Sequence, residues 1–227
     1  MRVHVAFTPD EAASAPTGIV VDVIRATSTI AQALSAGYAR VLCVSELEQA
    51  RTLRAELPDS IVGGERDAVR IEGFDVGAST REFLQPRAET LILSTTNGTR
   101  SIVTAAERCD EVLIGSLLNL DALVRKAEER GEDVAVICAG YEGAFALDDA
   151  YCAGRIVQRL EAERSDAAVA AEDRERLSRR AYGPERAHVR PALARGGHRL
   201  LCARERARRR SPIRRHVRPR REDRALV

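Results

Sequence analysis

The chain contains no tryptophan and only four tyrosines and four phenylalanines among its 227 residues. Recognition of bases or sugars by stacking on aromatic side chains is therefore not expected to be its main mode of binding. Its longest apolar runs, such as 90–94 and 134–140, fall far short of the ~20 residues that a membrane-spanning helix needs. The first residues enter an apolar strand pattern directly, without the segments of a secretory signal. We therefore expect a cytoplasmic protein that does not span a membrane.

Cysteine and histidine are also sparse. The five cysteines are odd in number, widely spaced and without a CxxC pair, which favours neither a disulfide framework nor a zinc site. We expect them to be buried thiols, including Cys138 at the end of an expected strand. Of the four histidines, His4 lies in the first expected strand and the others follow residue 187. This placement argues against a hydrolase that relays protons through histidine.

Lysine is almost absent, because Lys126 is the only one among 36 basic residues. The arginines concentrate in residues 172–227, which hold 19 of them with 7 acidic residues, so this segment carries a net charge of +12 and residues 1–171 carry −10. The segment lacks a sustained apolar period, so burying it would bury charge. We expect a folded domain over 1–171. The Arg-rich segment 172–227 is interpreted as frame-shifted or degenerate, as a solvated tail, or as a basic arm for nucleic acid.

Before residue 172, short β-branched runs alternate with segments of helical period. Strands separated by helices of this length form crossover units, which favour parallel pairing. The sequence therefore predicts an α/β fold with a mainly parallel or mixed sheet flanked by helices, with two subdomains as an option. The expected strands are 18–23, 40–44, 61–63, 90–94, 111–115 and 133–138, and the expected helices are 26–37 and 46–57, the second capped by Ser45, with others beginning near Gly98, Leu120 and Leu147.

The unusual polar residues follow the expected strands, and open sheets of this kind bind ligands beyond the carboxyl ends of their strands. Asp22 stands at the end of an otherwise apolar strand, where a carboxylate is costly unless it is paired or holds a metal. A hard cation such as Mg²⁺ takes carboxylate oxygens together with waters and substrate phosphate. Asp22 is therefore a candidate metal ligand or catalytic group. A salt bridge to Arg25 or a helix cap is the simpler alternative.

Two expected helices begin with runs of hydroxyl residues. Residues 25–29 (RATST) combine helix-start amides with an arginine whose planar guanidinium matches phosphate oxygens. Residues 94–99 (STTNGT) repeat this arrangement, with Asn97 and Gly98 suited to a close backbone approach. Each run alone could be an ordinary cap or turn, but together they favour a phosphate held from two sides. Neither matches the phosphate loop of nucleotide triphosphatases or the dinucleotide fingerprint.

Further charged residues are expected at the same edge. Residues 65–79 lack a period, which is typical of a functional loop, and they hold Glu65, Arg66 and Asp75. Asp148 and Asp149 begin a later helix, where adjacent side chains point about 100° apart, so at most one is expected to face the crevice. Each of these could instead be a surface pair or a favourable helix-start charge. Together with the hydroxyls, they indicate a site for a phosphate with a divalent metal.

Five motifs resemble, in order and spacing, the 2-phosphosulfolactate phosphatase (ComB-like) family over roughly residues 1–171. They are 21–30 (VDVIRATSTI), 64–66 (GER), 73–77 (GFDVG), 94–99 (STTNGT) and 146–154 (ALDDAYCAG). The resemblance implies a Mg²⁺-dependent hydrolase, of an α/β fold peculiar to that family, that converts 2-phospho-3-sulfolactate to 3-sulfolactate and phosphate on the way to coenzyme M. It also implies a homodimer. This chain departs from the family at 78–80, which read AST in place of Asn-Ser-Pro.

The motifs and the resemblance together define the expected site. The expected catalytic residues are Asp22, Arg25, Ser28 and Asn97. The expected substrate-binding residues are Thr27, Thr29, Arg66, Thr95, Thr96, Gly98 and Thr99. Mg²⁺ would be held by Asp22 and by one of Glu65, Asp75 or Asp148. Whether water or a side chain such as Asp22 or Ser28 attacks the phosphorus is open.

Two alternatives remain at this point. The same crevice could act on another phosphorylated 2-hydroxy acid, or the basic C-terminal segment could bind nucleic acid. Binding through about ten phosphate contacts would collapse between low and moderate salt, whereas Mg²⁺-dependent turnover would vanish with a chelator. We expect a small phosphorylated acid as the ligand rather than nucleic acid or a membrane.

Overall fold

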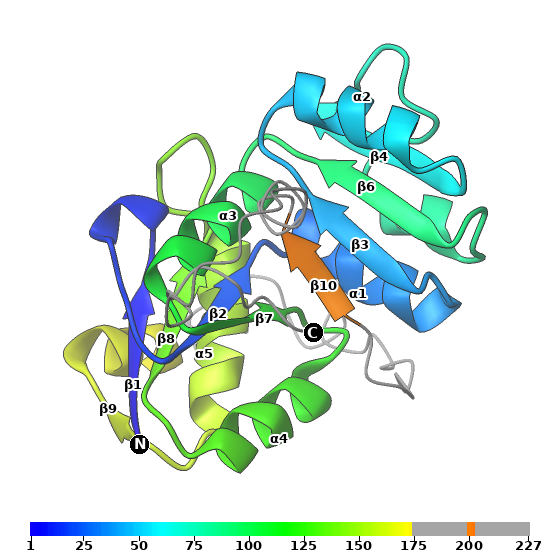
Figure 1. Ribbon diagram of the computed structural model, residues 1–227. Coiled ribbons are helices and arrows are strands. Elements are labelled where there is room, and N and C mark those ends of the chain that lie inside the picture. The colour runs from blue at the N-terminus through cyan, green and yellow to red at the C-terminus, as the bar shows by residue number, and fades with distance from the viewer. Residues whose placement is uncertain (174–198, 203–227) are drawn as a thin grey trace, which may run out of the picture.

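A computed structural model of the chain describes residues 1–173 and 199–202 (Figure 1). Its elements, in chain order, are β1 (Arg2–Ala6), η1 (Pro9–Glu11), β2 (Thr17–Val21), α1 (Ala26–Ala36), β3 (Arg40–Cys43), α2 (Leu47–Glu56), β4 (Ser60–Arg66), β5 (Val69–Arg70), η2 (Thr80–Phe83), β6 (Thr90–Ser94), α3 (Gly98–Arg108), β7 (Glu111–Gly115), α4 (Leu120–Arg130), β8 (Val134–Cys138), α5 (Leu147–Arg159), β9 (Glu163–Arg164) and β10 (Arg199–Cys202). Residues 166–173 are also helical.

The strands form two five-stranded sheets. Sheet A has the order β7-β2-β8-β1-β9, and all its neighbouring strands are parallel. Sheet B has the order β10-β3-β6-β4-β5, parallel except for the antiparallel pair β4 and β5. The predicted α/β fold with mainly parallel or mixed strands and flanking helices is confirmed.

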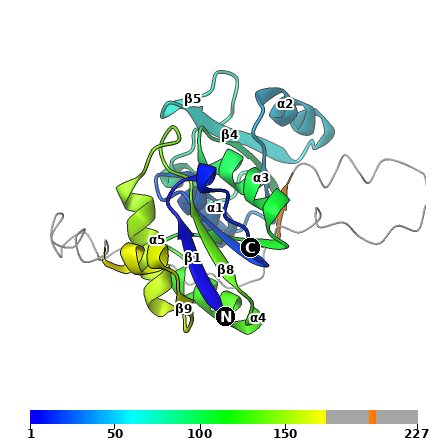
Figure 2. The same cartoon turned by 90° about the vertical axis from the view of Figure 1, so that its left-hand side faces the viewer.

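The helices and the two sheets lie in layers (Figures 1 and 2). Alternate residues of the strands pack in different apolar clusters, which defines the order of these layers. One face of sheet A packs with α4 and α5 in one apolar cluster. Its other face joins α1, α3 and the inner face of sheet B in the largest cluster. The outer face of sheet B packs on α2. The layer order is therefore α4 and α5, sheet A, α1 and α3, sheet B, and α2.

The sequences of the helices match these positions. Helix α1, between the two sheets, contains no charged residue, and eight of its eleven residues are buried. Helix α2 covers one outer face and buries only Ala50 and Leu53. Strands β2, β6, β7 and β8 are buried along their whole length because helices cover both faces of each sheet, and this explains their continuous apolar runs.

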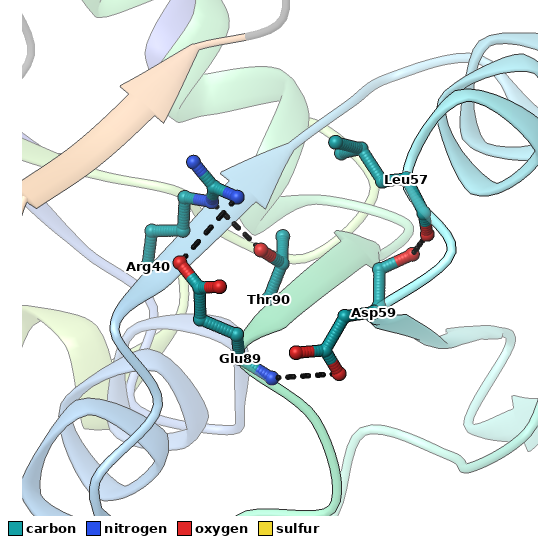
Figure 3. Close-up of polar contacts among 6 residues, drawn as sticks. Arg40, Leu57, Asp59, Glu89 and Thr90 are labelled. Atoms are coloured by element: carbon teal, nitrogen blue, oxygen red, sulfur yellow. Dashed lines mark hydrogen bonds and ion pairs between the residues drawn. The ribbon is translucent and has the colours of Figure 1, made fainter.

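Polar contacts hold the amino ends of the sheet B strands together (Figure 3). Arg40 donates from Nε to Thr90 Oγ1 at 2.7 Å and forms an ion pair with Glu89 at 3.6 Å. The Glu89 amide donates to Asp59 Oδ1 at 3.4 Å. These residues lie at the starts of β3, β4 and β6, the opposite edge from the carboxyl ends where the predicted ligand residues lie.

Some local predictions were wrong. Ser45 does not cap α2: Glu46 holds the N-cap position, without a side-chain capping bond. The expected strand 61–63 extends over Ser60–Arg66, and the region expected to be a loop from residue 65 begins with a β4–β5 hairpin. The strands expected at 90–94 and 111–115 have those bounds, and helices begin at Gly98, Leu120 and Leu147 as expected.

Most of the Arg-rich segment lies outside the described residues, namely 174–198 and 203–227. The segment 172–227 is described at residues 172–173 and at β10, which pairs with β3. The predicted nucleic-acid arm and the alternative interpretations of this segment stay predictions. Across the described ranges, none of the helices has the length and apolar character needed to cross a bilayer.

Candidate functional site

The carboxyl ends of β2 and β6, which belong to different sheets, meet at one place. Asp22 follows β2 and is 6% exposed, and Gly98 begins α3 just after β6. A β-carbon at Gly98 would overlap both Asp22 Oδ2 and Ala26 Cβ. The two strand-to-helix junctions are therefore in direct contact, and the two hydroxyl-rich motifs predicted to hold one phosphate are adjacent.

The environment of Asp22 disfavours its charge. Burial raises the pKa of Asp22 to about 7, and the negative charges of Asp148 and Glu65 add to the rise. The Ala26 amide, which hydrogen-bonds the carboxylate, and the Arg25 guanidinium lower this pKa and only partly offset the burial. The Asp22–Arg25 salt bridge that the sequence left open does not occur among the ion pairs of the described residues. The Asp22 carboxylate instead lies at the first turn of α1, where the Ala26 amide favours its charged form.

The hydroxyls at the start of α1 bind the protein's own backbone. Thr27 Oγ1 donates to the Asp22 carbonyl at 2.7 Å and accepts from the Asp22 amide at 3.0 Å. Ser28 Oγ donates to the Val23 carbonyl at 2.8 Å, and Thr29 Oγ1 donates to the Ala78 carbonyl at 2.7 Å. These bonds shape the loop that carries Asp22. The expected roles of Thr27, Ser28 and Thr29 toward substrate stay predictions.

The start of α3 is built in the same way. Thr95 and Thr99 bind each other's backbone amides through their hydroxyls, at 3.0 and 3.1 Å. Thr96 donates both its amide and its hydroxyl to the Glu65 carboxylate, at 2.8 and 3.2 Å. Asn97 Oδ1 accepts from the Glu142 amide at 3.2 Å. The start of α3 thus meets Asp22 at Gly98.

Glu65 and Arg66, at the end of β4, bind the loops around them. Both oxygens of Glu65 accept hydrogen bonds from Thr96, and Oε2 also accepts from the Ala68 amide at 2.8 Å. Arg66 donates to the carbonyls of Glu65 and Ser45 and to Ser94 Oγ, at 2.8, 3.1 and 2.9 Å. Glu65 therefore has less capacity left for a cation than its position in the sequence implied.

Asp75 binds the backbone of β4 and has no contact with Asp22 or Glu65 among the hydrogen bonds of the described residues. Its Oδ2 accepts from the Val62 amide at 2.8 Å, and its own amide donates to the Val62 carbonyl at 2.9 Å. This pairing extends the edge of β4. Asp75 is also not among the charges that shift the pKa of Asp22. The expectation that it holds metal is untested, and the structure gives its carboxylate a backbone partner instead.

The adjacent pair Asp148 and Asp149 divides as the helical spacing predicts. Asp148 is half-buried and lies close enough to Asp22 to raise its pKa. Asp149 is 2% exposed and accepts from the amides of Val23 and Gly140, at 2.8 and 3.0 Å. Burial raises the pKa of Asp149 to about 8, with the charges of Asp22 and Asp148 adding to the rise and the two amides opposing it.

Asp149 is a site residue that the sequence interpretation did not single out. A signal for it existed, because Asp149, Cys152, Ala153 and Ile156 follow the helical spacing of the buried face of α5. A carboxylate on such a face needs hydrogen-bond donors from the neighbouring layer.

The described carboxylates offer a cation few converging ligands. No group of three or more His, Cys, Asp or Glu side chains in the described ranges is arranged to hold a metal ion. Asp148 nevertheless lies close enough to Asp22 for its charge to raise the pKa of Asp22. Within the described part of the chain, Asp148 has no hydrogen bond or ion pair. Two carboxylates suit Mg²⁺, which keeps several waters and binds substrate phosphate.

The described cysteines are buried, as predicted: Cys43, Cys109, Cys138 and Cys152. Burial raises the pKa of the Cys138 thiol well above its usual value. A neutral thiol is a poor nucleophile, so Cys138 does not supply one here. His4 lies in β1, as expected, and bonds Ser165, whereas the other histidines lie outside the described residues.

Comparison with known proteins gives consistent matches. A sequence model of the family described as 2-phosphosulpholactate phosphatase matches residues 4–200. Three similar curated proteins, each named "Probable 2-phosphosulfolactate phosphatase", come from Clostridium acetobutylicum, Thermotoga petrophila and Thermus thermophilus. The first is 42% identical over 62% of this chain and 61% of its own length. The others are 39% and 40% identical, each over 70% of this chain and 68% of its own length. The chain thus spans about 60–70% of the length of these relatives.

Proposed function

Since this chain belongs to the 2-phosphosulfolactate phosphatase family, we propose that it hydrolyses 2-phospho-3-sulfolactate to 3-sulfolactate and inorganic phosphate. The proposal includes Mg²⁺ as cofactor, a homodimer and a place in coenzyme M biosynthesis. Another phosphorylated 2-hydroxy acid is the alternative substrate.

One observation carries the proposal. The motifs that mark the family are spread over residues 21–154, and the fold brings those around Asp22 and Gly98 into direct contact. Glu65 links the 64–66 motif to Thr96, and Asp149 links the last motif to Val23 in the first. An arrangement in which distant polar motifs come together at one place supports a single site that acts on a small charged molecule.

The reaction breaks the bond between phosphorus and the ester oxygen on carbon 2 of the substrate. A water oxygen bonds to phosphorus, the ester oxygen leaves and takes up a proton, and the water loses one. Arg25 is half-buried at the start of α1, where its guanidinium can pair with phosphate oxygens as their charge shifts in the transition state. The close approach of Gly98 to Asp22 supports a role for the start of α3, whose amides would bind the same phosphate.

The carboxylates Asp22 and Asp148 would hold Mg²⁺, since the charge of Asp148 is close enough to raise the pKa of Asp22 and Glu65 is occupied by backbone and hydroxyl donors. When bound, the ion neutralises phosphate charge and polarises the phosphoryl group. Arg66, held by three hydrogen bonds, places a fixed positive charge near the ends of β3, β4 and β6. This charge suits the sulfonate or carboxylate of the substrate.

The test measures phosphate release from 2-phosphosulfolactate and from 2-phospholactate, with Mg²⁺ and with EDTA. We expect release that is faster for 2-phosphosulfolactate, stops with EDTA and is lost in Asp22→Asn. Asp121→Asn on the exposed start of α4 serves as the matched control and should keep full activity. No release from either compound by the folded protein would refute the proposal, and release that persists in EDTA would refute its metal part.

A further inference from the structure

We propose that Asp149 is a positioning residue that holds Asp22 in its working orientation by binding the backbone of two loops at once. This inference rests on the proposed function for its kinetic consequence, whereas its structural consequence can be tested without any substrate.

The first contact of Asp149 lies next to Asp22. Its Oδ1 accepts from the Val23 amide at 2.8 Å, across 126 residues of sequence. That amide belongs to the peptide unit between Asp22 and Val23. The carbonyl of the same unit accepts from the Thr27 amide at 3.0 Å and from Thr27 Oγ1 at 2.7 Å. Because a peptide unit is planar, bonds at both of its polar ends set its orientation and the direction of the Asp22 side chain.

The second contact holds the loop after β8. Asp149 Oδ2 accepts from the Gly140 amide at 3.0 Å. Gly140 has a φ of +65°, and a β-carbon there would overlap the Ala144 carbonyl oxygen, so the loop turns back tightly on itself. The carbonyl and amide of Tyr141 pair with those of Ala144 at 2.9 and 3.0 Å.

These contacts form a closed path that begins and ends at Asp22. The Glu142 amide, two residues beyond Gly140, donates to Asn97 Oδ1 at 3.2 Å. Asn97 precedes Gly98, which packs against Asp22. The path from Asp22 through Val23, Asp149 and the 140–144 loop to α3 therefore returns to Asp22. Asp149 is the one side chain on this path that bonds two separate segments of backbone.

The chemistry of this position requires a side chain with two acceptor oxygens. Two amides from different segments need an acceptor oxygen on each side, and an asparagine in the same place offers one oxygen and one NH₂ group. An NH₂ group facing a backbone N–H leaves two donors opposed. Asp149 is 2% exposed and its oxygens are occupied, so it acts on the reaction through Asp22 rather than on the substrate.

The structural test is residue-resolved amide hydrogen exchange by NMR on the full chain, without substrate or metal. In the unaltered protein, the Val23 and Gly140 amides should be protected although both lie outside the strands. In Asp149→Asn their exchange should speed up at least ~10-fold, while amides inside β2 keep their protection. The Asp121→Asn control should leave both amides unchanged. If Val23 and Gly140 exchange in the unaltered protein as fast as exposed loop amides, the proposal is wrong, and this result needs no variant to fold.

The kinetic test separates positioning from general stability. Asp149→Asn should lower kcat ~10-fold or more and change KM for the substrate less than ~3-fold, because the Asp22 carboxylate that would hold Mg²⁺ is misplaced while the substrate contacts of other residues remain. Ile156→Val, a packing change on the same buried face of α5, should lower the melting temperature but keep kcat. Equal kcat values for these two variants would overturn the proposal. Absence of phosphate release by the unaltered protein would instead count against the proposed function and leave the exchange result to decide on Asp149.

Discussion

Asp22 and Gly98 pack so closely that the β-carbon of any other residue at position 98 would overlap Asp22 Oδ2. Asp22 follows a strand of sheet A, and Gly98 follows a strand of sheet B. The contact therefore joins the carboxyl ends of the two sheets. The candidate site forms where they meet, and its geometry depends on how tightly the layers pack.

Gly98→Ala tests this contact directly. The added methyl group must displace Asp22 or Ala26, so the free energy of unfolding should fall by about 1–3 kcal/mol. A shift of about 1 Å in a reacting group can lower the rate ~100-fold, so kcat should fall to a similar extent. Urea unfolding and phosphate release measure the two effects. Gly73→Ala is the control, because a β-carbon there meets nothing within 4 Å: its φ of +81° costs some stability, but kcat should stay unchanged. Full activity in Gly98→Ala would contradict the placement of Asp22.

Asp22→Asn should stabilise the metal-free protein at high pH while it abolishes activity. Burial raises the pKa of Asp22 from 3.8 to about 7, so between these pH values the folded state binds more protons than the unfolded state. The free energy of unfolding therefore falls as pH rises from about 4 to about 7. Above pH 7 the free energy of unfolding of Asp22→Asn should exceed that of the unaltered protein by on the order of 2–4 kcal/mol, because an uncharged amide avoids the cost of burying a charge.

Unfolding in urea at pH 4, 6 and 8, with EDTA present, measures this difference. Part of the pH dependence should remain in Asp22→Asn, because burial also raises the pKa of Asp149, to about 8. Equal stability of the two proteins at pH 8 would show that Asp22 carries its charge without cost, which is incompatible with its burial.

Asp148→Asn should weaken Mg²⁺ binding, whereas Asp75→Asn should not. The charge of Asp148 raises the pKa of Asp22, but the Asp75 carboxylate accepts from the Val62 amide, which an asparagine oxygen can also do. The Mg²⁺ concentration for half-maximal activity should rise ~10-fold or more in Asp148→Asn. Calorimetric titration with Mg²⁺ alone gives the same comparison without substrate. If Asp75→Asn weakened Mg²⁺ binding more than Asp148→Asn, Asp75 rather than Asp148 would be the second metal ligand.

Arg25 and Arg66 should behave differently when replaced by alanine. Arg66 donates three hydrogen bonds to the ends of β3, β4 and β6, so Arg66→Ala should lower the free energy of unfolding by about 2–3 kcal/mol. Arg25 has no such bonds in the described structure, so Arg25→Ala should keep stability and raise KM ~10-fold or more through the lost phosphate contact. Thermal unfolding and steady-state kinetics on both variants separate the roles. A strong loss of stability in Arg25→Ala would show that Arg25 stabilises the fold instead of binding phosphate.

Local patterns were sufficient for most of the elements. The strands at 90–94 and 111–115 were predicted with their actual bounds, since each is a short apolar run covered on both faces. The end of α1 was also readable, because Gly37 adopts the left-handed conformation that glycine favours. The cap of α2 was not: the carbonyl of Ser45 instead binds Arg66, which lies 21 residues away.

The candidate site was readable in part. Asp22 stood out because a carboxylate at the end of an apolar strand is costly unless it is paired or holds a metal. Its raised pKa is consistent with that cost. The hydroxyls of Thr27 and Thr99 were equally conspicuous, yet both bind nearby backbone. The role of Asp149 as a positioning residue could not be predicted, because its partner Val23 is 126 residues distant in sequence. No local pattern contains that pairing.

The sequence by itself determined the elements and the chemistry available to the site, since helix and strand periods, helix-start hydroxyls and strand-end carboxylates depend on residues a few positions apart. Only the tertiary structure decided that the strands divide between two sheets, with α1 and α3 between them, and that Asp22 lies against Gly98. It also decided which carboxylates remain available to a cation and which bind backbone amides. These outcomes depend on burial and on donors from distant segments, and such contacts exist only once the layers have packed.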